Sequence, residues 1–286
     1  MLDCLNYSGS LYHYTSEESY QYIVQPKDWF DDCISLQFTR IDCMTKNDQK
    51  ERKHIEDTVE QSIQILLKQH KIDREFADAV INYKTNHTGL SIQKVKDTFY
   101  IDIDKVNYYV ACFSTNSDNQ YIRTHFHAPK CISFLPIFSQ TFCPNPQNDF
   151  PSFGNSFMSF PTISFPPYPQ LHTKWRLFYN LKRVVYDDTK KIEIITQDLL
   201  EIYQRSDPKD ISDLKHRLQA MYSTYDAFFK AKQIGNEEYY KEEEVRFVIE
   251  IPDKISDNLQ SQGKIKFDTN KEHLYLPIDK RFLKLN

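Results

Sequence analysis

An acidic stretch near the carboxyl end holds the residues best suited to chemistry. It reads YYKEEEVRFVIEI, over residues 239–251. Residues two apart in an extended chain share a face, so we expect Glu242, Glu244 and Arg246 on one face of a strand. Two carboxylates this close raise one another's pKa, which an active-site cleft can exploit. The same pattern also fits a charged edge strand whose glutamates pair with Arg246 and water.

The opposite face of this expected strand is apolar. It carries Val245, Phe247, Ile249 and Ile251. Burial of these residues would fix the register of the strand, because a slip by one residue would expose them all. The glutamates would then project from a rigid support.

Composition limits the classes of function. The chain has 286 residues, of which 40% are hydrophobic and 27% charged, with a net charge of -4 and a pI near 6.1. It is long enough to bury a substantial core, and it lacks the basic character that dominates nucleic-acid affinity. With no apolar run near 18 residues and no amino-terminal signal peptide, we expect neither a membrane partner nor classical secretion.

Two further features of composition exclude common sites. Only five glycines occur, where an average chain would hold roughly 20, so neither a dinucleotide-binding loop nor a Walker loop can be assembled. The six cysteines form no CxxC pair, which indicates reduced thiols. His125, His127 and Cys131 could approach one metal ion, but no second ligand pair has suitable spacing, so we expect no metal. Nothing selects one cysteine as a protease nucleophile.

Periodicity and capping signals predict the elements that carry these residues. The expected strands cover residues 11–14, 34–40, 97–103, 107–115, 175–181 and 183–188, and the expected helices cover about 16–24, 47–70, 74–84 and 211–232. Thr15 and Glu18 form a capping box for the first helix, which places His13 at a strand-to-helix junction. The order of elements indicates an α+β fold, with one domain over residues 1–286.

One segment resists any regular element. Prolines are interspersed with phenylalanines over residues 144–170. Proline is excluded from helix interiors and central strands, so we expect a long surface loop inserted in the domain. The alternative is a lid or a target-docking arm.

Three segments, LYHYTS (11–16), VACFSTNSDNQYIRTHF (110–126) and KQIGNEEYYKEEEVRFVIE (232–250), carry a resemblance that spans most of the chain. They resemble the signatures of a widespread, mostly uncharacterised bacterial domain family. In the same order, they are similar to the mono-ADP-ribosyltransferase superfamily. The resemblance implies a split two-sheet ADP-ribosyltransferase-like core with flanking helices, and NAD as a co-substrate held without a glycine-rich turn.

The resemblance also assigns roles to residues that would contact NAD. His13 matches the first-strand position and would hydrogen-bond the adenosine ribose, with Tyr14 beside it. Ser114 and Thr115 match the first two residues of the middle-strand motif, and Ser114 would brace Glu244. We expect Arg40, at the end of the second strand, to supply a phosphate contact.

This sequence departs from the family patterns at several positions. Asn116 stands where a second serine would complete the middle motif, Ile122 and Arg123 replace Met-Trp, and Tyr239 replaces a tryptophan. A first-strand histidine combined with Glu-x-Glu is also a mixed pattern, because arginine-specific transferases usually begin with arginine.

The implied chemistry suits the two glutamates. Cleavage of the nicotinamide glycosidic bond develops positive charge on the ribose, which a carboxylate stabilises. By the resemblance, Glu244 would hold the nicotinamide ribose and that charge. Glu242 would orient and help deprotonate the acceptor, and a carboxylate there points to a protein arginine. The resemblance thus implies an NAD-dependent mono-ADP-ribosyltransferase.

Other functions remain open from the sequence. An NAD glycohydrolase would use the same glutamate with water as the acceptor. An RNA 2′-phosphotransferase-like activity would need basic residues that this acidic chain lacks. A non-catalytic domain could keep the scaffold and bind a partner through the proline-rich arm.

The composition suits a cytoplasmic protein or a bacterial effector delivered into a host cytosol by a specialised secretion system. The protein acceptor would then be a host metabolic enzyme such as glutamate dehydrogenase, by analogy with effector transferases.

Overall fold

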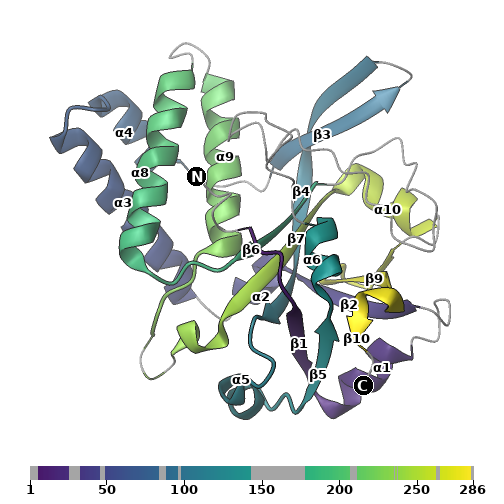
Figure 1. The fold of residues 1–286 in the computed structure, drawn as a ribbon. Helices are drawn as coiled ribbons and strands as arrows, with labels where there is room; N and C mark the ends of the chain where they lie inside the picture. The colour runs from purple at the N-terminus through teal and green to yellow at the C-terminus, as the bar shows by residue number, and fades with distance from the viewer. Residues whose placement is uncertain are drawn as a thin grey trace.

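The computed structural model describes residues 6–25, 33–45, 49–83, 88–95, 98–142, 178–206, 211–234, 236, 238–261 and 265–284. The predicted loop at 144–170 lies outside these residues. The described chain is mixed α and β with a curled antiparallel sheet, which agrees with the predicted α+β class (Figure 1).

The sheet is built around one long strand. The strands are β1 (Leu11–Thr15), β2 (Cys33–Arg40), β3 (Thr88–Val95), β4 (Thr98–Ser114), β5 (Lys130–Phe134), β6 (Phe178–Arg183), β7 (Glu244–Pro252), β8 (Lys266–Phe267), β9 (His273–Asp279) and β10 (Leu283–Lys284). Within the described residues they pair in the order β10-β5-β1-β4-β2-β9-β8, with β3 and β7 also on β4 and β6 on β7. One edge of β4 pairs with β7, and the other edge pairs first with β2 and then with β1.

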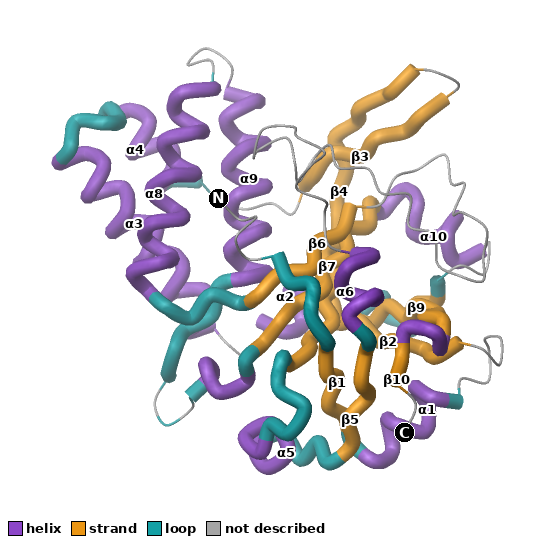
Figure 2. The backbone as a smooth tube through the Cα atoms, viewed as in Figure 1, coloured by secondary structure: helices purple, strands orange, loops and turns teal. Residues whose placement is uncertain are grey.

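Helices cover the sheet. They are α1 (Glu17–Val24), α2 (Ile41–Thr45), α3 (Gln49–Lys68), α4 (Arg74–Ile81), α5 (Gln120–His125), α6 (Pro136–Phe142), α8 (Asp188–Arg205), α9 (Ile211–Phe228) and α10 (Asp253–Ser261), with 3-10 turns η2 (Tyr239–Glu242) and η3 (Lys280–Phe282). Helices α3, α4, α8 and α9 gather into one helical layer beside the sheet (Figure 2).

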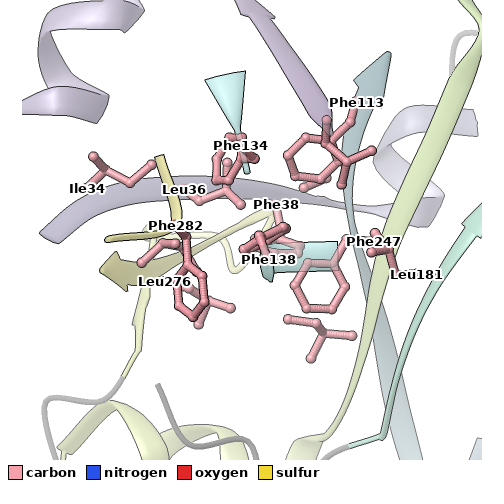
Figure 3. Close-up of a cluster of buried hydrophobic side chains, with 14 of the residues drawn as sticks. Ile34, Leu36, Phe38, Phe113, Phe134, Phe138, Leu181, Phe247, Leu276 and Phe282 are labelled. Atoms are coloured by element: carbon pink, nitrogen blue, oxygen red, sulfur yellow. The ribbon is translucent and has the colours of Figure 1, made fainter. Parts of the chain in front are cut away.

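Two apolar cores lie on the two faces of the sheet. The first is rich in aromatic rings and includes the apolar face of β7, as the alternation predicted; Phe38, Phe138 and Phe247 are each fully buried there (Figure 3). The second joins the opposite sheet face, through Val110 and Val248, to the helical layer. Because both faces of β7 are covered, its charged side chains lie in the interior rather than on a solvated edge.

Some elements differ from the sequence prediction. Residues 98–114 form one continuous strand, because β3, β2, β1 and β7 pair along its length. The first helix is capped by Ser16 rather than Thr15, which belongs to β1. Helix α9 ends at Phe228, because the next residue forms a β-bridge with Val185. Helix α8 was not predicted.

Candidate active site

The three sequence motifs lie on three adjacent strands at one level. Tyr12 of β1 is the Cα partner of Ser114 on β4, and Ser114 is in turn the partner of Glu244 on β7. Partner residues in an antiparallel pair point to the same side. The sheet therefore brings the middle and late motifs into direct contact, with the first motif alongside.

The expectation that Glu242 and Glu244 lie on one face of a single strand is wrong. Glu242 ends the η2 turn, and Glu243 adopts a left-handed conformation with φ 49° and ψ 48°. Strand β7 begins only at Glu244. The left-handed residue turns the chain sharply between the two glutamates, so they reach a common place from a turn and from a strand.

That common place is a buried ionic cluster of four side chains, Glu242, Glu244, Lys230 and Arg246. The Lys230 Nζ lies 2.9 and 3.1 Å from the two carboxylate oxygens of Glu242, and 3.6 Å from Oε2 of Glu244. Arg246 donates to both oxygens of Glu244, at 2.9 and 3.3 Å, and to the carbonyl of Ala227 at 3.0 Å. Both glutamates are only 6% exposed, so the two cations compensate charges that water does not reach.

The surroundings drive the pKa values of the two glutamates apart. Burial raises the pKa of Glu242 to about 7, helped by the charge of Glu244 and opposed by Lys230. Burial would also raise the pKa of Glu244, but the charges of Arg246 and Lys230, with hydrogen bonds from Arg246 and Cys112, lower it to about 2. Within the pair, Glu244 therefore favours the charged form, and Glu242 binds a proton more readily than Glu244 does.

A hydrogen-bond network holds the turn that carries Glu242. The Ser114 hydroxyl donates to the carbonyl of Glu242 at 2.8 Å, and the Asn119 side chain donates to the carbonyl of Lys241 at 2.8 Å. The sequence resemblance implies that Ser114 braces Glu244. The two residues do pair through their backbones, but the hydroxyl holds the carbonyl of Glu242 instead.

Tyr14 and Thr115 belong to the same network. The Tyr14 hydroxyl donates to the carbonyl of Asn116 at 2.7 Å and accepts from the backbone N–H of Asn119 at 2.8 Å. The Thr115 hydroxyl and the Asn116 amide donate to the two carboxylate oxygens of Glu243, at 3.3 and 3.1 Å. Asn116, a departure from the family pattern, thus helps to fix the turn.

His13 lies beside this network, but its side chain leaves β1 on the opposite side from Tyr12. Its Nδ1 is 3.0 Å from the carbonyl of Cys112, and its ring packs 5.7 Å from that of Phe113. A carbonyl only accepts, so Nδ1 carries the proton. Burial lowers the pKa of His13, although this hydrogen bond acts in the opposite direction. Burial therefore favours the neutral imidazole.

His13 lines a groove of about 460 Å³, at the place where β1 and β2 diverge from the same edge of β4. The groove is lined by His13, Thr15, Ser19, Tyr22, Ile23, Ser35, Gln37, Thr39, Met44, Val110, Ala111, Cys112 and Tyr275. Its volume lies in the range of small-ligand sites, which run from about 300 to 1,000 Å³. Cys112 connects the groove to the ionic cluster, because its thiol also hydrogen-bonds the Glu244 carboxylate.

Arg40 does not join the other predicted residues. Its Cα partner on β4 is Tyr109, roughly 16 Å along the strand from Ser114. Its Nη1 donates to the carbonyl of Lys271 at 3.3 Å, and Arg40 is not among the described residues that line the groove. The predicted phosphate contact would therefore require a different arrangement of this side chain.

Sequence reasoning missed the residues that complete the cluster. Lys230 follows α9 and resembles any cation at a helix end, and Tyr186 lies between β6 and α8. Burial and then the charges of Glu244 and Glu242 raise the pKa of Tyr186, so its ring faces the cluster. Neither residue has a local sequence signal, because both reach the glutamates through tertiary folding.

A metal site, a membrane-spanning helix and a second cavity are the other features that bear on function. Among the described residues, no three His, Cys, Asp or Glu side chains converge as metal ligands, and His125 stacks on Tyr121 instead. No helix in the described ranges is both long and apolar enough to cross a bilayer. A second cavity of about 580 Å³ lies between α3 and α9, and none of the predicted site residues line it.

Comparison of the chain with protein-family models, with curated proteins and with solved structures gives no match.

Proposed function

We propose that this protein is an NAD-dependent mono-ADP-ribosyltransferase that modifies a protein side chain, with arginine as the acceptor. The observation that carries the proposal is the row of Tyr12, Ser114 and Glu244 across three adjacent strands. Cys112 links Glu244 to the ligand-sized groove, which neither glutamate lines. This arrangement is compatible with the split-sheet core that the sequence resemblance implies.

The groove suits the neutral parts of NAD. Its walls offer hydroxyl and amide groups from β1, α1, β2 and β9, and its floor is the edge of β4. Such groups can hydrogen-bond ribose hydroxyls and a base edge. No lysine or arginine is among its described lining residues, so hydroxyl groups would have to meet the pyrophosphate.

The difference between the two glutamates supports distinct chemical roles. When their surroundings drive the pKa values of two titratable groups apart, the two groups commonly take different acid–base or electrostatic roles in an active site. Glu244, with a pKa of about 2, remains negative and would stabilise the positive charge that develops on the ribose. Glu242, with a pKa of about 7, would accept a proton.

The proposed step balances as follows. The bond between ribose C1′ and the nicotinamide nitrogen breaks, and its electron pair leaves with neutral nicotinamide. A nitrogen of the acceptor guanidinium bonds to C1′ and loses one proton, which the Glu242 carboxylate accepts. With water in place of the guanidinium, the same step releases free ADP-ribose, as in an NAD glycohydrolase.

One observation favours a second candidate, a non-catalytic interaction domain. Both glutamates are nearly inaccessible, and Lys230 and Arg246 already compensate their charges. A purely structural ionic cluster has the same features.

Purified protein incubated with ADP-ribose-labelled NAD, with and without a cell lysate, separates these functions. Label on an arginine of a lysate protein, located by mass spectrometry, is the expected result. Free labelled ADP-ribose in both reactions would show hydrolysis instead. Intact NAD in both reactions would overturn the proposed enzyme and favour the interaction domain.

A further inference from the structure

Lys230 holds a central place in the ionic cluster although it is remote in sequence from β7. Its ammonium spans both oxygens of Glu242 at 2.9 and 3.1 Å, and it lies 4.5 Å from the centre of the Tyr239 ring. Its side chain is 11% exposed. These contacts give the ammonium a fixed position with little solvent around it.

The backbone holds Lys230 in this place. Its N–H donates to the carbonyl of Val185 at 3.2 Å, next to the β-bridge between Val185 and Phe229. The short segment after α9 is thereby bonded to the segment that follows β6. The N–H of Tyr240 donates to the carbonyl of Lys232 at 3.5 Å, which ties the same segment to the η2 turn. Lys230 and Glu242 are therefore positioned by two connected backbone segments.

Charged and titratable groups from several described elements surround the pair of Glu242 and Glu244. Strand β7 contributes Glu244 and Arg246, and the segment before α8 contributes Tyr186. Cys112 of β4 contacts Glu244, and Lys182 of β6 is the Cα partner of Arg246. Arg246 directs its Nε and Nη2 to Glu244, whereas Lys230 hydrogen-bonds both oxygens of Glu242.

The hydrogen bonds of the two cations therefore go to different glutamates, although the Lys230 ammonium also lies 3.6 Å from Glu244. Burial, and then the repulsion from Glu244, raise the pKa of Glu242, and Lys230 opposes both effects. Without the ammonium, the Glu242 carboxylate would face the charge of Glu244 in a site that excludes water, and it would bind a proton more readily.

We propose that Lys230 is a positioning residue whose ammonium holds the Glu242 carboxylate in place and balances its charge, so that Glu242 can take the acceptor's proton. The catalytic part of this inference, proton transfer from the acceptor to Glu242, rests on the proposed function. It predicts that Lys230 matters for transfer to a guanidinium, which needs Glu242, much more than for the loss of nicotinamide, which needs Glu244.

Lys230→Met tests this role, with Lys232→Met as the matched control. Lys232 lies two residues away, is exposed, and places its ammonium over the Tyr240 ring at 5.4 Å. At pH 7 we expect Lys230→Met to lower the rate of arginine transfer at least tenfold and NAD hydrolysis less than threefold. We also expect the acidic limb of its transfer profile to move upward by one pH unit or more. Lys232→Met should stay within twofold of the wild type, and Lys230→Arg, which keeps the positive charge, should leave the acidic limb of the transfer profile in place.

Equal losses of transfer and hydrolysis, or an unmoved transfer profile, would overturn the inference. Lys230→Gln serves the same purpose if the methionine variant fails to fold, because its amide can donate one hydrogen bond without charge. A second readout needs no activity: a carbon-13 carboxyl titration, with the Glu242 signal assigned by its loss in Glu242→Gln. Its midpoint should rise by at least one pH unit in the uncharged variant, and an unchanged midpoint refutes the role of Lys230. Absence of NAD turnover in the wild type would refute the proposed function but not this control of Glu242.

Discussion

Replacement of Glu250 by glutamine should make the protein more stable at alkaline pH. Glu250 lies on β7 with its side chain on the helical-layer side, like Glu244 and Val248, and it is the Cα partner of Tyr108. Burial raises its pKa to about 8, and no counter-charge from the described part of the chain opposes the effect. Its charged form is therefore unfavourable in the folded state.

The size and sign of the effect follow from this pKa. A rise from 4.5 to about 8 corresponds to an upper limit of about 5 kcal/mol, at roughly 1.4 kcal/mol per pH unit. Because the folded-state pKa is the higher one, the folded protein binds more protons between pH 4.5 and 8. The free energy of unfolding therefore falls as the pH rises through that window. Glutamine removes this contribution while keeping the shape of the side chain.

Urea denaturation of the wild type and of Glu250→Gln, at several pH values from 5 to 9, measures the effect. The difference between the two proteins isolates Glu250, because other groups such as Glu242 titrate in both. We expect the variant to gain about 2–5 kcal/mol relative to the wild type between pH 5 and pH 9. Glu75→Gln, on the exposed side of α4, should show no such trend. Parallel pH profiles for the wild type and Glu250→Gln would refute the reasoning.

Two further substitutions test the ionic cluster and the turn. Arg246→Met should lower the free energy of unfolding by about 3–5 kcal/mol, because it leaves Glu244 buried with Lys230 alone. Urea denaturation measures this loss, and adding Glu244→Gln should recover part of it; a loss below about 1 kcal/mol would show that the pair is solvated. Asn119→Ala should cost about 1–3 kcal/mol and speed amide hydrogen exchange at Glu243 and Thr115, because the turn loses its hydrogen bond to Lys241. Unchanged exchange at those two amides would mean that other contacts hold the turn.

The sequence predicted the parts of the fold that depend on local periodicity. The alternation of Val245, Phe247 and Ile249 placed the buried face of β7 correctly. Helix α8 also has such a pattern, with the Asp187 cap followed by Ile194, Ile195 and Leu199, and it could have been predicted. The full length of β4 was harder to predict, because its second half pairs with β1, β2 and β7, which lie far from it in sequence.

The candidate site was predictable only in part, for reasons that concern geometry. Spacing alone placed Glu242 on the strand, because nothing in the sequence marks Glu243 as a left-handed residue. Lys230 reaches the glutamates through a β-bridge between remote segments, which periodicity does not reveal. His13 was located correctly on the first strand, yet its side chain points to the opposite side from Tyr12, toward the groove.

Nicotinamide release from NAD is the most direct measurement of the central claim. The wild type should release nicotinamide in the absence of any acceptor. Glu244→Gln should lower that rate at least a hundredfold under conditions in which urea denaturation shows the variant to be folded. The exposed Glu75→Gln, on α4 away from the ionic cluster, should retain the wild-type rate. Equal rates in the wild type and in folded Glu244→Gln would contradict the assignment of the buried glutamate to this chemistry.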